Sequence, residues 1–261
     1  MRVNVKKNLL LFRVFVILLT FNVFFSCKTA TYSNYKVEGK KISVTSEKGE
    51  NDKINTFIAP YKQRITADLD NVLSYAPETF DKSKGKWQTT IGNLFAIIAF
   101  EAANPIFQSR EQKSIDFCIL NSGGIRAIIP KGPVSTRTAY EVMPFENSLI
   151  IVGLTGKKVR ELATYFMQEK KPHPLYGIKI YADKTNLTVS KIEINGKLID
   201  DNTLYYVATS DYLANGGDNM VFFKESTIKF DIQYKLRNML IDYFKKTKTL
   251  PVITDEKIIL E

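Results

Sequence analysis

Histidine is nearly absent from this chain of 261 residues, whose single histidine, His173, lies between two prolines. Metal sites that hydrolyse phosphate esters draw on clusters of histidine and carboxylate ligands, so one loop histidine excludes a dinuclear site of that kind. The sequence also lacks a G-x-S-x-G turn, a Walker A loop and a G-x-G-x-x-G loop. We therefore expect no catalytic residue and no metal ligand in this chain, and we interpret His173 as an exposed loop residue.

Cysteine is almost as scarce, with two residues in the chain. Cys118 lies in the apolar run 115–120 and is expected to be a buried, inert thiol. Cys27 follows an apolar run, residues 14–25, that is preceded by basic residues, which is typical of a signal peptide and short for a membrane span. Ser26-Cys27 resembles a bacterial lipoprotein box, so we expect Cys27 to be lipidated and no disulfide to form. A simple secretory signal with an incidental cysteine is the alternative.

Charge gives a weaker indication of the kind of ligand. The formal net charge of +10 falls to +6 without the four basic residues that precede Cys27. A moderately basic protein suits an anionic ligand or surface. The sequence has no clustered stripe of lysine and arginine, so we expect no nucleic-acid polymer as a partner.

The chain divides by composition into a signal peptide (residues 1–26), a polar Lys/Ser/Gly-rich lipidated tether (27–55) and one domain (56–261). Within the domain, periodicity and turn residues predict helices and strands that interleave irregularly around an Asn195-Gly196 hairpin, which indicates an α+β fold. The expected helices are Thr56–Leu69, Thr90–Ala103, Thr136–Val142, 155–166 and Ile232–Phe244. The expected strands are Val72–Ala76, Ile115–Leu120, Ser148–Leu154, Gly177–Ala182, Thr188–Ile194 and Tyr205–Ser210, and 130–133 is expected to be a turn.

Two glycine-rich loops, 121–126 and 211–218, each follow a predicted strand and carry polar side chains. Paired glycines let a backbone approach a ligand closely. Phe145 and Tyr212 lie in turn contexts where their rings could stack on a flat heterocycle, while Asp218 could accept hydrogen bonds from a ribose and Arg126 could pair with a phosphate. The alternative interpretation is of tight turns with a surface arginine and two partly buried aromatic rings.

Taken together and in this order, five segments resemble the C-terminal domain of the 5′-nucleotidase/UDP-sugar hydrolase family: 91–94 (IGNL), 121–126 (NSGGIR), 144–147 (PFEN), 154–156 (LTG) and 212–218 (YLANGGD). The resemblance implies a four-layer α/β/β/α sandwich that holds the nucleoside of the substrate. It implies that two rings sandwich the base, that Asn121 and Asn147 bind the base edge, that Asp218 holds the ribose and that Arg126 holds a phosphate. The substrate-binding residues expected by position are Asn121, Gly123, Gly124, Arg126, Phe145, Asn147, Tyr212, Asn215, Gly217 and Asp218.

The sequence departs from the family in two respects. Lys86 stands near the position of a further phosphate-binding arginine, and nothing in the chain resembles the metallophosphatase domain that carries the family's metals. We therefore expect the nucleotide-recognition half of a split 5′-nucleotidase, lipid-anchored in a bacterial cell envelope, with metals only in a separate metallophosphatase chain. A non-catalytic nucleoside-binding lipoprotein and a relic scaffold with a decayed pocket are the alternatives.

Overall fold

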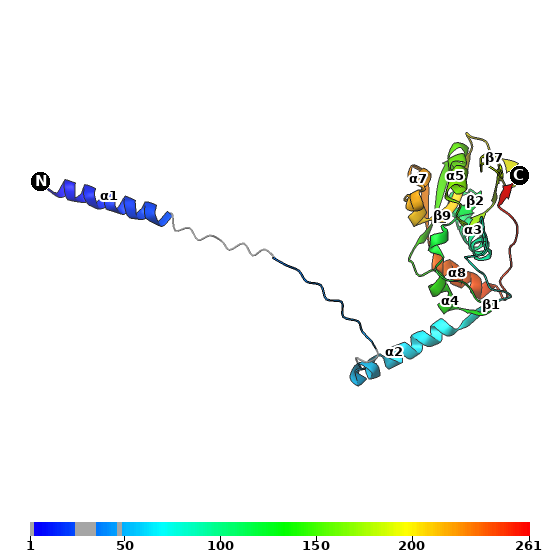
Figure 1. Cartoon of the computed structure of the whole chain (residues 1–261), viewed down its shortest axis with the longest axis horizontal. Coiled ribbons are helices and arrows are strands. Elements are labelled where there is room, and N and C mark those ends of the chain that lie inside the picture. The colour runs from blue at the N-terminus through cyan, green and yellow to red at the C-terminus, as the bar shows by residue number, and fades with distance from the viewer. Residues whose placement is uncertain (1–2, 24–34, 46–48) are drawn as a thin grey trace. The chain divides into compact units, whose positions relative to one another are not determined.

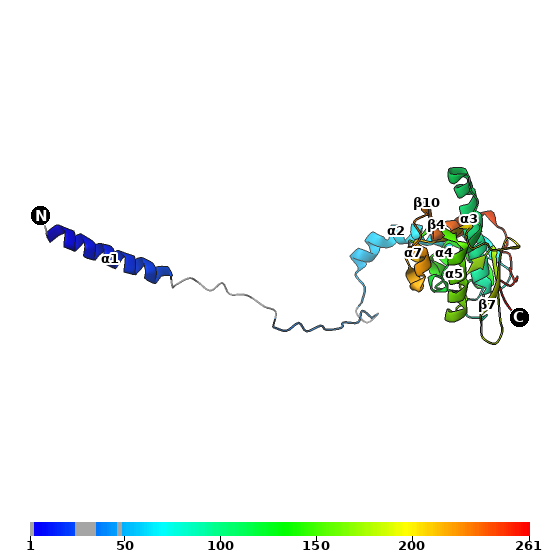
Figure 2. The ribbon, with the colours of Figure 1, turned by 90° about the horizontal axis from the view of Figure 1, so that it is seen from above.

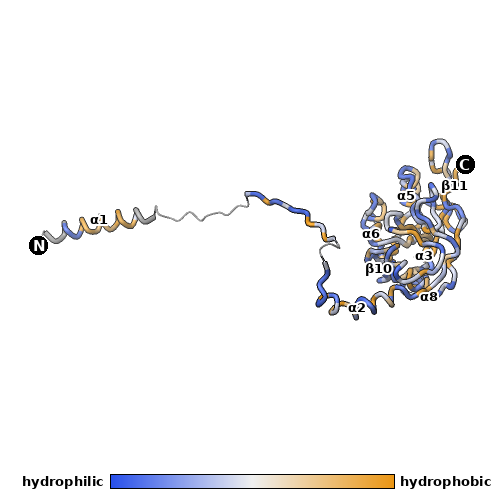
Figure 3. The backbone as a smooth tube through the Cα atoms, turned by 60° about the horizontal axis from the view of Figure 1, so that its bottom comes forward, coloured by the Kyte–Doolittle hydropathy of each residue, from blue (hydrophilic) through white to orange (hydrophobic). Residues whose placement is uncertain are grey.

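The computed structural model describes residues 3–23, 35–45 and 49–261. Its chain contacts divide it into two compact units, Met1–Asp52 and Lys53–Glu261. Among the described residues of the first unit, helix α1 (Val3–Val23) covers most of the basic segment and of the apolar run of the predicted signal peptide, and its middle is orange in Figure 3. Cys27, the predicted lipidation site, lies outside the described residues.

From Asp52 onward the chain alternates between helices and strands (Figure 1). The helices are α2 (Asp52–Asp70), α3 (Thr90–Glu111), α4 (Thr136–Val142), α5 (Gly156–Glu169), α6 (Asp211–Ala214), α7 (Val221–Lys224) and α8 (Leu236–Lys246), with 3-10 turns η2 (Ser122–Gly124) and η3 (Gly217–Asn219). The strands are β1 (Val72–Ala76), β2 (Phe117–Ile119), β3 (Gly132–Ser135), β4 (Ser148–Thr155), β5 (Leu175–Tyr176), β6 (Ile178–Ala182), β7 (Val189–Ile194), β8 (Lys197–Leu198), β9 (Leu204–Ser210), β10 (Lys229–Lys235) and β11 (Ile258–Leu260).

The strands form three sheets. The central sheet has five strands in the order β10-β4-β9-β2-β5, a second has four in the order β11-β6-β7-β8, and β1 pairs with β3. In the central sheet β9 runs parallel to β2 and antiparallel to β4. Mixed sheets with interleaved helices confirm the predicted α+β class.

The central sheet is buried on both faces, with side chains alternating between two cores. On one face Cys118 and Leu120 belong to a core that includes α3 and α8. On the other face Phe117 and Ile119 belong to a core that includes α5 and the inward side chains of the four-stranded sheet. Figure 1 shows α3, α5 and α8 gathered around the strands, and Figure 2 shows α3 and α5 from above, so helices and two main sheets make the layers of the predicted sandwich.

Helix α3 is the most apolar of the long helices of the domain. It is the one helix among the described residues that is long and apolar enough to cross a membrane by length and composition, but 56% of its most apolar window is buried inside the domain. The hydroxyl of Thr89 accepts the N–H of Gly92 at 3.0 Å and so caps its first turn. The helix continues past Pro105 to Glu111, beyond the predicted end at Ala103.

Three expectations about local structure were wrong. The predicted helix Ile232–Phe244 begins only at Leu236, because Lys229–Lys235 pairs with β4 as an edge strand whose Ile232 faces the core. Gly132–Ser135 is a strand paired with β1, where a turn was expected over 130–133. His173 is buried, with 2% of its surface exposed, because its ring packs against Phe166 and Tyr165 of helix α5.

Helix α2 differs from every other long helix of the domain because none of its residues is buried. Its apolar side chains recur at helical spacing and remain in solvent, with 71% of Phe57, 61% of Tyr61 and 57% of Ile65 exposed. An exposed apolar stripe of this kind is typical of an interaction surface.

We predict that Thr89→Ala lowers the free energy of unfolding by about 1 kcal/mol, because the Gly92 N–H loses its capping acceptor. Urea denaturation measures this change. The matched control is Thr164→Ala, which removes an exposed hydroxyl bonded within α5 to the Arg160 carbonyl and should change stability by less than about 0.5 kcal/mol. Equal losses in the two variants would contradict the capping role of Thr89.

Candidate functional site

Three loops meet at one edge of the central sheet. Because β2 and β9 are parallel, the 121–126 and 211–218 loops that follow them leave from the same edge. Because β4 is antiparallel to β9, with Leu149 opposite Ser210, the 143–147 loop enters β4 at that edge as well. The sheet thus brings together segments that are up to about a hundred residues apart in sequence.

Between these loops lies a pocket of about 300 Å³. This volume is at the small end of the range for small-molecule sites. Eight of the ten predicted binding residues line it: Asn121, Gly123, Gly124, Arg126, Phe145, Asn147, Tyr212 and Asp218. Its other lining residues are Leu120, Ile125, Met143 and Leu236.

The 121–126 loop forms the first wall through the tight turn η2. A Cβ at Gly124 would lie 2.9 Å from Oδ1 of Asn121 and would push that amide aside, whereas at Gly123 the nearest atom of Asn121 would be at an ordinary 3.5 Å. The guanidinium of Arg126 donates to the Gly123 carbonyl at 3.2 Å, and its main-chain N–H donates to the Val142 carbonyl at 2.8 Å. Arg126 is exposed at the mouth of the pocket, with donors left for an anion.

The 143–147 loop forms the second wall with Phe145 and Asn147. Phe145 is 42% exposed, which is a large fraction for an aromatic ring, and the guanidinium of Arg126 lies 5.4 Å from the ring centroid. This cation–π contact joins the first two walls. Asn147 is partly buried and lines the pocket.

The 211–218 loop forms the third wall with Tyr212, which is 44% exposed, and Asp218. The Tyr212 hydroxyl donates to Oδ1 of Asp218 at 2.9 Å and accepts the Asp218 N–H at 3.2 Å. Asp218 adopts the left-handed region (φ 51°, ψ 30°), which is uncommon for a residue with a side chain and recurs at functional sites. A Cβ at Gly217 would lie 2.5 Å from the Tyr212 ring, so this glycine allows the ring to lie against the backbone.

Asn215 and Gly217, the other two predicted binding residues, do not line this pocket. They border an adjoining open depression that shares Asn147 and Tyr212 with it. The Asn215 amide donates to the Asp211 carbonyl at 2.9 Å, so its side chain shapes the loop.

The chemistry of the pocket is that of recognition. Apolar surface comes from Leu120, Ile125, Met143 and Leu236, and two exposed aromatic rings supply flat faces. The polar groups are two amides that both donate and accept, a carboxylate that accepts and a guanidinium that donates. Neither Phe145 nor Tyr212 contacts another aromatic ring within the described residues. Their exposed surfaces remain available to a planar ligand.

Two polar side chains, the buried Arg237 and the partly buried Tyr165, hold two of the walls from behind, and sequence reasoning missed them. Arg237 is buried, donates to the carbonyls of Met143 and Pro144 at 3.4 and 3.1 Å, and pairs with the carboxylate of Glu146. Its guanidinium lies 4.2 Å from the centroid of the Tyr140 ring. The structure places Arg237 in the first turn of α8, where a cation is unfavourable for the helix dipole. With the helix expected to begin at Ile232, the sequence did not give this signal.

Tyr165 supports the third wall, since its hydroxyl donates to the main-chain carbonyl of Asp218 at 2.7 Å. Partial burial, together with nearby carboxylates, raises the pKa of Tyr165 to about 12, so the hydroxyl keeps its proton at neutral pH. Lys86, considered as a substitute for a phosphate-binding arginine, does not line the pocket, and its ammonium lies 5.4 Å from the centroid of the Trp87 ring.

Comparison with known proteins identifies the domain. The family model for the 5′-nucleotidase C-terminal domain matches residues 66–225, more than half of the chain. The chain belongs to this family. The family description fits a domain that recognises nucleotides, as the predicted resemblance implied.

The relatives are longer proteins. The chain is 25% identical over 197 residues to the UshA protein of Escherichia coli, an alignment that covers 73% of this chain and 34% of UshA. It is 28% identical over 193 residues to a 5′-nucleotidase of Vibrio vulnificus, covering 70% of this chain and 32% of that protein. The chain thus spans about a third of the length of these curated relatives.

A solved structure agrees on the fold. The 5′-nucleotidase precursor from Thermus thermophilus superposes with a TM-score of 0.65 at 23% identity, covering 82% of this chain and 44% of that one. This likeness supports the four-layer sandwich.

A bound metal ion needs a cluster of side chains that can hold it. Within residues 3–23, 35–45 and 49–261, no group of three His, Cys, Asp or Glu side chains is placed to hold a metal ion. Burial raises the pKa of the Cys118 thiol far above its ordinary value, so this cysteine is not a thiolate ligand or nucleophile at neutral pH, as predicted.

We predict that Arg237→Met loosens the 143–147 loop and lowers the free energy of unfolding by about 1–3 kcal/mol, because two carbonyls lose a charged donor. Hydrogen exchange of the Leu236 amide, which donates to the Asn147 carbonyl at 2.9 Å, should become faster.

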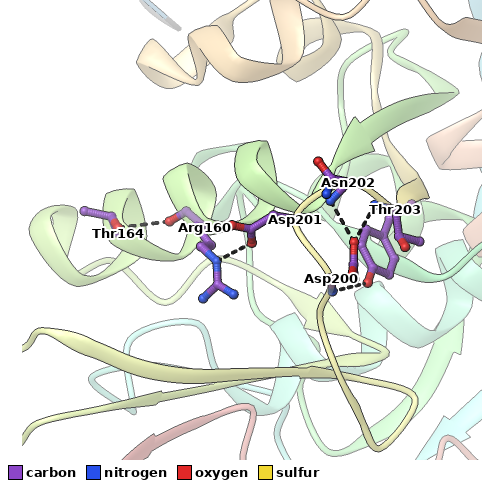
Figure 4. Close-up of polar contacts among 7 residues, drawn as sticks. Arg160, Thr164, Asp200, Asp201, Asn202 and Thr203 are labelled. Carbon is purple, nitrogen blue, oxygen red and sulfur yellow. Dashed lines mark hydrogen bonds and ion pairs between the residues drawn. The ribbon is translucent and has the colours of Figure 1, made fainter.

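The matched control is Arg160→Met on the surface of α5. Arg160 pairs with Asp201 at 2.6 Å, and both side chains are about half exposed (Figure 4). An exposed pair contributes at most about 1 kcal/mol, so this variant should leave Leu236 exchange unchanged. If both variants behave alike, Arg237 does not hold the loop.

Proposed function

We propose that this chain is the nucleotide-recognition half of a two-chain 5′-nucleotidase. The observation that carries the proposal is the convergence of two exposed rings, two amides, a carboxylate and an arginine on one pocket. A separate chain with a metallophosphatase fold supplies the metals and the attacking water. This chain contributes by orienting the substrate, and positioning alone lowers the barrier of a reaction substantially.

Each side chain has a role in the proposal. The base stacks between Phe145 and Tyr212, the amides of Asn121 and Asn147 bind its edge, and Asp218 accepts hydrogen bonds from the ribose hydroxyls. Arg126, at the mouth of the pocket, pairs with a phosphate. Because Arg126 is exposed, a phosphate bound to it lies toward solvent, where a second protein can reach it.

The catalytic chain needs a surface on which to dock, and the stripe Phe57, Tyr61 and Ile65 on α2 is suited to it. The helix carries three basic and three acidic residues, a balance that does not favour an anionic lipid surface. Its heptad pattern is interrupted by Arg64 or Asp68, depending on register, which disfavours a coiled coil with a second copy. The match to the family begins at residue 66, inside this helix, so most of the helix lies outside the matched domain.

The proposed location is the bacterial cell envelope, with the chain anchored through a lipid on Cys27. The support is the sequence pattern of the first 27 residues, a basic segment and an apolar run that end in Ser26-Cys27. Substrates would then be extracellular or periplasmic nucleotides, whose dephosphorylation belongs to nucleotide breakdown.

We predict that Phe145→Ala and Tyr212→Ala each weaken AMP binding by about 1–3 kcal/mol, because each removes one stacking face. Isothermal titration calorimetry with AMP, adenosine and UDP-glucose measures the change and ranks the ligands. The control is Phe57→Ala, an exposed aromatic on α2, which should bind AMP with unchanged affinity. Changes below a few tenths of a kcal/mol in both pocket variants would show that the base does not stack there.

We predict that the full-length chain, mixed in detergent with a metallophosphatase encoded beside its gene, accelerates AMP hydrolysis over the phosphatase alone. Phe57→Glu should reduce the acceleration of AMP hydrolysis by about tenfold or more, because it places a charge in an apolar contact between the two chains. The affinity of this variant for AMP should be unchanged. Phe145→Ala should show the opposite pattern, with weak AMP binding and an intact association of the two chains. No acceleration with the wild-type chain refutes the split enzyme, and AMP binding without acceleration favours a nucleotide-binding lipoprotein.

A further inference from the structure

The single histidine of the chain has no role in the proposed recognition, yet it is buried directly behind the first wall of the pocket. Nδ1 of His173 accepts the main-chain N–H of Ser122 at 3.2 Å. Ser122 lies between Asn121 and Gly123, both of which line the pocket. The imidazole is therefore the acceptor that holds the turn of the 121–126 loop from its inner side.

The surroundings of His173 fix its ring. The ring centroid lies 5.3 Å from that of Phe166 in an edge-to-face contact and 6.1 Å from that of Tyr165. The main chain on either side is bonded too, since the His173 N–H donates to the Lys171 carbonyl at 2.8 Å and the Pro174 carbonyl accepts the Leu120 N–H at 3.0 Å. The imidazole has little freedom to turn away from Ser122.

The hydrogen bond also fixes the tautomer. Because Nδ1 accepts, the proton of the neutral ring is on Nε2, which is buried and has no hydrogen-bond partner within the described residues. A buried polar atom without a partner is costly in free energy. A phenylalanine would avoid that cost but would lose the acceptor for Ser122.

We propose that His173 is a positioning residue of the nucleotide pocket, which sets the 121–126 loop by accepting the Ser122 N–H. The inference rests on the proposed function, because it assigns the purpose of the loop geometry to ligand binding. Loss of the acceptor frees Ser122 and with it Asn121, the amide that faces the base.

Protonation of His173 has a defined consequence. Protonation of the neutral ring would add its second proton to Nδ1. Nδ1 would then be a donor facing the Ser122 N–H, which is also a donor, and the hydrogen bond between them would break. Desolvation lowers the pKa of His173 from its ordinary value of 6.5 to about 4, opposed by the nearby carboxylates of Asp218 and Glu169 and assisted by Lys171. The Tyr165 hydroxyl, which donates to the Asp218 carbonyl, is uncharged at these pH values.

The sign of the pH dependence follows from this lowered pKa. Between pH 6.5 and about 4 the unfolded chain takes up the proton more readily than the folded one. The stability contributed by neutral His173 is therefore fully present above pH 6.5 and is lost as the pH falls toward 4.

The test compares two substitutions of His173 in the full-length chain. His173→Asn keeps an oxygen acceptor at the δ position but loses the ring, whereas His173→Phe keeps the ring but loses the acceptor. We expect AMP binding about tenfold weaker in His173→Phe and within about threefold of wild type in His173→Asn. Thermal unfolding should rank the variants the other way, with His173→Phe the more stable, because the ring fills its apolar surroundings.

Two further measurements separate the proposal from its alternatives. Nuclear magnetic resonance of the imidazole nitrogens, unambiguous because the chain has one histidine, should show the Nε2–H tautomer and a shift when AMP binds. Thr209→Val, which removes a buried hydroxyl that has no hydrogen-bond partner among the described residues, should leave AMP affinity within about twofold.

The outcomes are distinguishable. If wild type binds none of the nucleotides tested, the proposed function fails, and faster exchange of the Ser122 amide in His173→Phe would then show a purely structural brace. If wild type binds AMP and the more stable of the two His173 variants also binds AMP more tightly, the positioning role is overturned.

Discussion

The parallel pairing of β2 with β9, and the antiparallel pairing of β9 with β4, is the constraint on which the site depends. Strand direction decides at which edge of a sheet a loop emerges. With Cys118 opposite Ala208 and Leu149 opposite Ser210, the ends of β2 and β9 and the beginning of β4 share one edge. β10 also ends there, with Lys235 opposite Ser148, so α8 starts behind the pocket. A change of direction in any one strand would carry its loop to the far edge and disperse the site.

The pocket is shaped by groups that no ligand would touch. Arg237 holds the 143–147 loop, Tyr165 holds Asp218 and His173 holds Ser122, in each case through the main chain. Main-chain anchoring fixes a loop while leaving its side chains free to meet a ligand, which is the arrangement expected of a preorganised binding site. The donors and acceptors of this support come from α8, α5 and the Pro-rich loop, elements that pack on the two faces of the central sheet.

Local patterns predicted most of the elements, and the errors have specific causes. Ile232, Leu236 and Leu240 are spaced by four, so a strand residue followed by a helix gave the appearance of one longer helix. Pairing with β4 decided that Ile232 belongs to a strand. His173 stood in a proline-rich segment, which usually indicates an exposed loop, and only packing against Phe166 and Tyr165 decided that it is buried.

The sequence by itself determined the α+β class, the order of the motifs and the residue types of the candidate site, because these depend on short-range periodicity and on glycine, amide and aromatic chemistry at fixed spacing. The sequence predicted that Phe145, Tyr212 and Asp218 lie in loops, but it gave no distances between these residues in space. Only the tertiary structure decided that eight of the ten predicted binding residues share one pocket and that Asn215 and Gly217 lie beside it. Strand pairing over long sequence separations sets those distances, and buried polar groups such as Arg237 and His173 gain their roles only from neighbours that the fold supplies.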